Sequence, residues 1–219
     1  MILRAAAIEL MATAFLLIAI VGSGIMAERL CGGNIGLTLL ANAIATGGAL
    51  VALILAFGPG SGAHMNPIVT LAAAATGGFA WRAVPAYLAA QLAGAVIGVW
   101  LVHLMFDLPV WQLSAHGRGG PGQWIAELVA TFGLLMIVWG CRAHAAPVVA
   151  FAVAAYITGA YWFTASTAFA NPAVTIARML SDSFAGIRPA DAPAFILAQF
   201  TGLLLALPLL RAGWLEART

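Results

Sequence analysis

Long apolar stretches follow one another along the chain, separated by short polar connectors. A helix needs about 20 apolar residues to cross a hydrocarbon core of about 30 Å. By that measure we predict six transmembrane helices, near residues 5–27, 34–57, 82–106, 123–142, 146–166 and 192–211. The N-terminal stretch is longer than the apolar core of a signal peptide and has no evident cleavage motif, so it counts as the first span.

Two shorter apolar segments interrupt this pattern, and both begin with nearly the same motif. It reads Asn66-Pro67-Ile68-Val69-Thr70 in the first half and Asn171-Pro172-Ala173-Val174-Thr175 in the second. Asn is a favourable N-cap, and Pro suits the first helical turn because its missing N–H would have no partner there. A first helix from Asn66 to Gly77-Gly78 would be roughly 16 Å long. We therefore expect two helices that each cross about half of the hydrocarbon core.

Further motifs recur in the same order in both halves. Glu9-Leu10-x-Ala12-Thr13 is matched by Glu127-Leu128-x-Ala130-Thr131, and Gln91-x-x-Gly94 is matched by Gln199-x-x-Gly202. An odd number of spans per half turns the second copy upside down relative to the first. We predict an all-α membrane protein with a single domain over residues 1–219, built from inverted repeats near 1–106 and 121–219. Its site should lie at the midplane, where the half-helices meet.

The composition places the chain in a membrane. It is 63% hydrophobic and 7% charged, whereas a soluble domain has about 25% charged residues. A net charge of +2 is too small for a nucleic-acid-binding protein. Cys31 and Cys141 fall in different halves without metal-ligand spacing, so we expect free thiols. The sequence shows no phosphate-binding loop, no metal cluster and no nucleophile with a base, so we expect no cofactor and no enzymatic activity.

The arginines favour a cytoplasmic N-terminus, because positive residues are enriched in cytoplasmic loops. In that orientation the inner arginines are Arg4, Arg82, Arg142, Arg211 and Arg218, and the outer ones are Arg29, Arg118 and Arg188. Six spans then place both termini in the cytoplasm, and in a bacterium the protein would lie in the inner membrane. Tryptophans near the span ends, such as Trp81, Trp111, Trp124 and Trp214, are expected to anchor the protein at the interfaces.

The paired Asn-Pro motifs, a glutamate near the start of the first and fourth spans and the lead-in Ser61-Gly62-Ala63-His64-Met65-Asn66 together resemble the aquaporin and aquaglyceroporin family. The resemblance covers essentially the whole chain, and two motif copies in the right order make it specific. It implies a homotetramer in the lipid bilayer with one pore per subunit. It also implies passive conduction of water or small uncharged solutes, with exclusion of protons.

Two positions depart from the family's pattern. The first motif reads Asn66-Pro67-Ile68 where Ala is usual at the third position, and Val174 follows the second motif where the family usually has Arg. By the family's motif distances, the narrowest ring consists of Thr46, Gly159, Ala168 and Val174. Four small, uncharged residues predict an opening wide enough for a polyol. Valine at this position resembles a bacterial branch of aquaglyceroporins associated with arsenic resistance, which implies undissociated arsenous acid as a solute.

Asn66 and Asn171 are the first candidates for contact with a solute. Each half-helix N-terminus carries roughly half a positive charge and free N–H groups, so two that face each other disfavour cations. The Asn amides can donate to the oxygen of a passing water or hydroxyl group and interrupt a water wire. The alternative is that each Asn only caps its helix. Pro67 and Pro172 are expected to be structural members of the two pore motifs, which end with Ile68 and Ala173.

Glu9 and Glu127 are carboxylates inside apolar spans, where a charge costs about 2.5–3.5 kcal/mol on insertion scales. They could accept hydrogen bonds from the irregular backbone that leads into each half-helix, or act as a proton relay in a coupled transporter. Their symmetric placement favours the first role. His64, two residues before Asn66, is expected to pack against or bond the same connector, and a gating role is its alternative.

Arg178 lies about two turns after Asn171 on the same helix face as Val174. One hypothesis places it in the outer vestibule, paired with Asp182 at i+4 and leaving the ring wide. The other lets it extend to the membrane interface without a role in the pore. It could reach the ring only by leaning back one turn, in the direction in which helical side chains do lean.

The sequence therefore predicts a passive channel for glycerol-like molecules and metalloid hydroxides such as arsenous acid, with water. The nearest alternative is a water-selective aquaporin. Two alternatives come from other classes: a proton-coupled secondary transporter that uses Glu9 or Glu127, and a structural membrane protein with a sealed pore.

Overall fold

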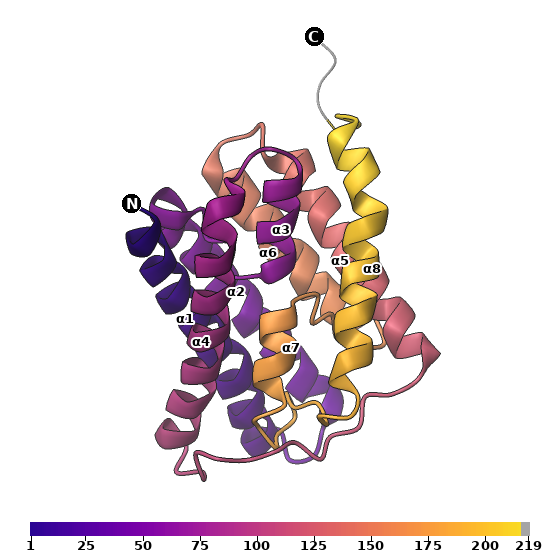
Figure 1. Cartoon of the computed structure of the whole chain (residues 1–219). Helices are drawn as coiled ribbons and strands as arrows, with labels where there is room; N and C mark the ends of the chain where they lie inside the picture. The colour runs from indigo at the N-terminus through magenta and orange to yellow at the C-terminus, as the bar shows by residue number, and fades with distance from the viewer. Residues whose placement is uncertain (216–219) are drawn as a thin grey trace.

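The chain folds into a bundle of helices, which the computed structural model describes for residues 1–215 (Figure 1). The six long helices are α1 (Ile2–Leu30), α2 (Ile35–Ser61), α4 (Val84–Met105), α5 (Pro121–Cys141), α6 (Ala146–Phe163) and α8 (Ala192–Arg211). All six are long and apolar enough to cross a membrane. The third span runs from Trp81 to Met105, because it includes the short helix η1 (Trp81–Ala83) directly before α4. This confirms the six predicted spans. Arg218, which entered the orientation argument, lies outside the described residues.

The two short helices begin where the repeated motif predicts. They are α3 (Pro67–Ala75) and α7 (Pro172–Arg178). The Asn66 side chain accepts a hydrogen bond from the N–H of Ile68 at 2.9 Å, and the Asn171 side chain accepts one from Ala173 at 3.0 Å. After α3 the chain turns at Gly77, whose φ of 79° lies in the left-handed region that glycine adopts most easily. Local capping thus sets the starts of both half-helices.

Within each half, the first and third long helices pack closely at a glycine. A Cβ atom on Gly94 of α4 would overlap the carbonyl oxygen of Leu10 in α1. In the second half, a Cβ on Gly202 of α8 would lie 2.8 Å from the carbonyl oxygen of Leu128 in α5. The two glycines recur in the sequence because each lets a pair of helices approach more closely than any side chain allows.

Gly94→Ala is expected to destabilise the protein although alanine favours helices. The added methyl group must push apart two backbones, and overpacking of this kind costs about 1–3 kcal/mol. Gly48→Ala is the matched control, because a Cβ there meets nothing within 4 Å. Thermal unfolding in detergent should show a lower midpoint for Gly94→Ala and an unchanged or higher one for Gly48→Ala. Equal midpoints for the two variants would contradict the close crossing.

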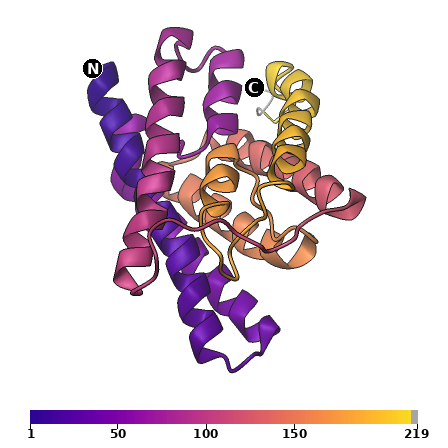
Figure 2. The same cartoon turned by 60° about the horizontal axis from the view of Figure 1, so that its bottom comes forward.

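The connector between α4 and α5 runs across the end of the bundle where α7 ends and α8 begins, as Figure 2 shows. It is held there by hydrogen bonds from Ser114 N to Met179 O at 2.8 Å and from Arg188 N to His116 O at 2.7 Å. Arg118, a residue of this connector, is buried, and burial lowers its pKa to about 10. Its guanidinium therefore stays charged at neutral pH. Met1 and the end of α8 lie on the opposite face of the bundle (Figure 1).

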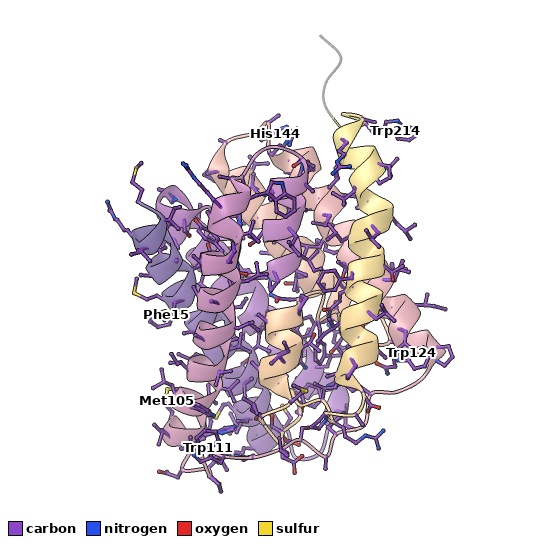
Figure 3. The ribbon with its side chains drawn as sticks, viewed as in Figure 1. Phe15, Met105, Trp111, Trp124, His144 and Trp214 are labelled. Carbon is purple, nitrogen blue, oxygen red and sulfur yellow. The ribbon has the colours of Figure 1, made fainter. Side chains whose placement is uncertain are left out.

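Large apolar side chains cover the outside of the bundle. Phe15 and Met105, labelled in Figure 3, are 53% and 59% exposed and point away from the helices. Trp111 and Trp124 lie toward the end of the bundle that holds the long connector, and Trp214 lies at the opposite end (Figure 3). An apolar surface with tryptophans toward both ends suits a bilayer, whose interfaces are enriched in this residue.

Candidate functional site

The N-terminal tips of α3 and α7 meet inside the bundle and are tied together by two reciprocal hydrogen bonds. Asn66 Nδ2 donates to the carbonyl of Ala170, and Asn171 Nδ2 donates to the carbonyl of Met65, each at 2.8 Å. Each amide nitrogen has two hydrogens, so one N–H per Asn remains. Both Asn residues also line a cavity that runs through the bundle. Each Asn thus caps its own helix, bonds the opposite connector and keeps one donor for the cavity.

The connectors that lead into the half-helices share an unusual backbone. Ala63 and Met65 have φ values of 46° and 48°, and Ala168 and Ala170 have φ values of 49° and 47°. These positions lie three residues and one residue before each Asn. Non-glycine residues in the left-handed region cost about 1–2 kcal/mol each, so surrounding contacts must hold them.

Glu9 supplies these contacts in the first half. Its carboxylate is fully buried and accepts from His64 N at 2.9 Å, Met65 N at 2.7 Å and Ser61 Oγ at 2.7 Å. It also accepts from Gln91 Nε2 at 2.8 Å. The backbone donors belong to the irregular connector, as the first of the two roles considered for Glu9 requires.

Glu127 does the same in the second half. It is fully buried and accepts from Phe169 N at 2.8 Å, Ala170 N at 2.9 Å and Gln199 Nε2 at 2.6 Å. Among the described residues that line the cavity there is no aspartate or glutamate. Each carboxylate therefore lies behind its connector, where it can support the backbone.

Four residues of the site received no role from the sequence. Gln91 Nε2 bonds both Glu9 and Thr70 Oγ1, the latter at 2.9 Å, and Gln199 Nε2 bonds both Glu127 and Thr175 Oγ1, also at 2.9 Å. The threonine hydroxyls in turn donate to the carbonyls of the two motif Asn residues. The recurrence of Gln and Thr in the two halves was the available signal. It reflects one Glu–Gln–Thr arrangement that is built twice.

His64 is part of the first connector and also lines the cavity. Its Nδ1 lies 3.1 Å from Thr70 Oγ1, and its ring centre lies 5.2 Å from that of Phe79 and 5.5 Å from that of Tyr87. The residue thus both bonds and packs at the connector. Phe169 takes the corresponding place in the second half, two residues before Asn171.

The cavity has a volume of about 320 Å³ and extends to both sides of the paired Asn tips. On one side its lining includes Thr76, Gly78 and Arg142, and on the other it includes Thr46, Val174 and Arg178. Most of the lining is apolar, as is usual for sites that hold small organic molecules.

Three of the four residues predicted to form the narrowest ring line the cavity. Thr46, Ala168 and Val174 all line the cavity. Gly159 does not, and a Cβ on it would point toward Phe163 at 3.5 Å. Gly159 is therefore not among the residues that line the cavity. Gly159 was predicted from its distance of 12 residues before Asn171. The non-helical residues 164–170 lie between α6 and Asn171, so this distance does not determine which face of α6 points to the cavity.

Tyr161, two residues after Gly159 on α6, lies at the cavity beside Thr46. It is 3% exposed, lines the cavity, and its hydroxyl lies 3.2 Å from Thr46 Oγ1. Ile157, one turn earlier on α6, lines the cavity as well. Residue 159 lies two positions from each of them and so faces the other way. The part of the cavity around Thr46 is therefore lined by an aromatic ring and two hydroxyl groups as well as by small residues.

Arg178 lines the cavity, as the first of the two hypotheses requires, but it does not pair with Asp182. Its side chain is 1% exposed, so it does not extend to the membrane interface. Asp182 does not pair with it, because Asp182 Oδ1 accepts from Ala115 N at 2.8 Å. The guanidinium instead lies on the Phe169 ring, with Cζ 3.4 Å from the ring centre, and its Nε–H donates to the carbonyl of Ala185. The side chain leans back toward the start of α7.

Known proteins resemble this chain over most of its length. Residues 1–146 match the sequence profile of the Major intrinsic protein family. The chain is 50% identical over 208 residues to Aquaglyceroporin AqpS of Rhizobium meliloti (strain 1021), covering 94% of this chain and 88% of that protein. It is 31% identical over 152 residues to Aquaporin Z of Rhodopseudomonas palustris (strain ATCC BAA-98 / CGA009), covering 64% of this chain and 62% of that protein.

A solved structure shares the fold. The X-ray structure of the aquaglyceroporin from Plasmodium falciparum aligns with a TM-score of 0.74 over 99% of this chain and 97% of that one. The sequence identity in this alignment is 19%, so the likeness concerns the fold alone.

Proposed function

The chain belongs to the Major intrinsic protein family of membrane channels, and we propose that it passively conducts glycerol-like molecules and undissociated arsenous acid, together with water. It is a multi-pass integral membrane protein. The observation that supports this solute class is the composition of the constriction. Thr46 and Tyr161 present hydroxyl groups, whereas Ala168 and Val174 present apolar surface. A small polyol is complementary to this lining, because it has hydroxyl groups along one side and C–H groups along the other.

Arsenous acid belongs to the same class by its chemistry, because it is a small neutral triol. A constriction that exchanges hydrogen bonds with glycerol can do the same for its three hydroxyl groups. The 50% identity to a protein named aquaglyceroporin supports a solute wider than water. Valine at position 174, where the family usually has arginine, supports the same width.

The remaining parts of the proposal follow from the same lining. The two helix tips hold a positive potential at the midplane, and the described lining has no carboxylate, so cations and protons should be held back. Glu9 and Glu127 accept hydrogen bonds from the backbone of the two connectors and hold these connectors in place. This supporting role fits a channel that allows only downhill flux and performs no catalysis. We propose that the two halves are inverted copies, that four subunits assemble with one pore each, and that both termini are cytoplasmic, at the inner membrane in a bacterium.

Reswelling of proteoliposomes tests the proposal. Vesicles shrunk by sorbitol, glycerol or arsenous acid should stay shrunken with sorbitol and reswell quickly with the other two, at rates at least about tenfold above protein-free vesicles. Water flux without solute entry would instead identify a water-selective aquaporin. Uptake against a gradient that depends on a pH difference would identify the coupled transporter.

A further inference from the structure

Arg178 is a buried cation whose charge no described carboxylate neutralises by a direct contact. Its Nε–H donates to the carbonyl of Ala185. Within residues 1–215, its two terminal nitrogens have no protein acceptor. Burying charged N–H groups without acceptors is costly, so such groups are expected to face a partner that is not part of the protein. Arg178 lines the cavity, and the cavity is where such a partner would lie.

The position of the guanidinium follows from the geometry of α7. Arg178 lies one turn after Val174, a rise of about 6 Å along the helix. Helical side chains lean toward the N-terminus, so a long side chain at 178 can cover that rise. The guanidinium contacts the ring of Phe169, a residue that precedes α7, with Cζ 3.4 Å from the ring centre, and Phe169, Val174 and Arg178 line the same cavity. The ring provides a flat surface on which a cation is stabilised.

Arg118 shows what a purely structural arginine looks like at the same place. Its Cζ lies 5.1 Å from the centre of the same Phe169 ring. However, its side chain donates to the carbonyls of Gly186 at 2.7 Å, Phe184 at 3.0 Å and Ser166 at 3.3 Å, and it does not line the cavity. Arg118 therefore ties loops together, whereas the terminal N–H groups of Arg178 remain available.

We propose that Arg178 is the specificity-determining cation of the constriction, and that its guanidinium is supplied from one helical turn beyond Val174 on α7. The proposal rests on the channel function proposed above. Arg178 donates to the oxygens of a hydroxylated solute, next to the apolar surface that Val174 presents on the same face of α7. Its fixed charge repels cations at the same point. Because the guanidinium comes from a turn further out, Val174 leaves room for a solute that an arginine at 174 would exclude.

Arg178→Met tests the proposal, because methionine keeps an apolar contact with Phe169 but has neither charge nor donors. We expect sodium and proton permeability to rise by about tenfold or more, and the ratio of glycerol to urea flux to fall by about threefold to tenfold. Arg178→Lys should restore the cation barrier. It should not restore the solute ratio, because an ammonium lacks the planar fork of the guanidinium. Arg118→Met is the matched control, with lower stability expected but an unchanged solute ratio and no cation leak.

The measurements are glycerol and urea reswelling and cation conductance in proteoliposomes with equal amounts of folded protein. If Arg178→Met folds poorly, Phe169→Leu serves instead, because it removes the surface that holds the guanidinium and leaves the backbone bond of residue 169 to Glu127. It should shift both readouts in the same direction by a smaller factor. Unchanged ratio and conductance in the folded variants would overturn the proposal for Arg178. Absence of glycerol flux in the unmodified protein would instead overturn the channel proposal.

Discussion

Glu127→Leu is expected to abolish solute flux and most of the folded protein, whereas Glu127→Gln should retain part of both. Leucine leaves the N–H groups of Phe169 and Ala170 without an acceptor at a fully buried position. Each buried, unsatisfied group costs about 1–3 kcal/mol, so the two together cost about 2–6 kcal/mol. The connector also loses the contacts that hold Ala168 and Ala170 at positive φ. Thermal unfolding in detergent and glycerol reswelling of proteoliposomes measure the two effects.

Glu28→Leu is the matched control for the loss of a glutamate. Glu28 also accepts a backbone N–H, from Phe184 at 3.1 Å, but it is exposed, so water can replace the lost partner. We expect a change in stability of no more than about 0.5 kcal/mol. If Glu127→Gln folded normally and lost only a pH-driven uptake, Glu127 would be a proton carrier and the supporting role would be wrong.

The parts of the fold that depend on local chemistry could be predicted from the sequence. The six spans follow from the length of apolar runs, and the starts of α3 and α7 follow from Asn caps and Pro in the first turn. Gly94 and Gly202 appear in the sequence as a repeated Gln-x-x-Gly motif. The motif recurs because each glycine lies where two helices of its own half cross closely. Each of these features is set by residues that are neighbours in the sequence or on one helix face.

The residues of the constriction could not be predicted to the same degree, because their positions depend on the path of non-helical segments of the chain. Residues 164–170 separate α6 from Asn171, and no periodicity passes through them to say whether Gly159 or Tyr161 turns inward. For Arg178, the sequence places the Cα on the correct face of α7. The direction of a long side chain depends on its contacts, and here the Phe169 ring and the Ala185 carbonyl draw it back toward the ring. Asp182 was the nearest acidic residue along the sequence, so it was the predicted partner of Arg178. In the structure, Asp182 instead accepts a hydrogen bond from Ala115 in the connector between α4 and α5.

Val174→Arg is expected to lower glycerol and arsenous acid flux by about tenfold or more, with a smaller loss of water flux. Val174 is 3% exposed to solvent and lines the cavity with Thr46 and Ala168. A guanidinium at this position would fill the space that we assign to the carbon edge of a polyol. Stopped-flow light scattering with equal amounts of reconstituted protein measures the three fluxes. Val174→Leu is the control for bulk without charge, and it should reduce solute flux less.

The variant Val174→Arg also places a second guanidinium one turn from Arg178, where like charges repel. The double variant Val174→Arg/Arg178→Met removes this conflict, because it moves the single charge inward by one turn. If Arg178 already serves as the cation of the constriction, the double variant should hold back cations as well as the unmodified protein does, while it excludes glycerol. Width and charge would then be separable properties of one helix face, set by residues 174 and 178 respectively. Glycerol flux that is unchanged in both variants would mean that the narrowest point lies away from Val174.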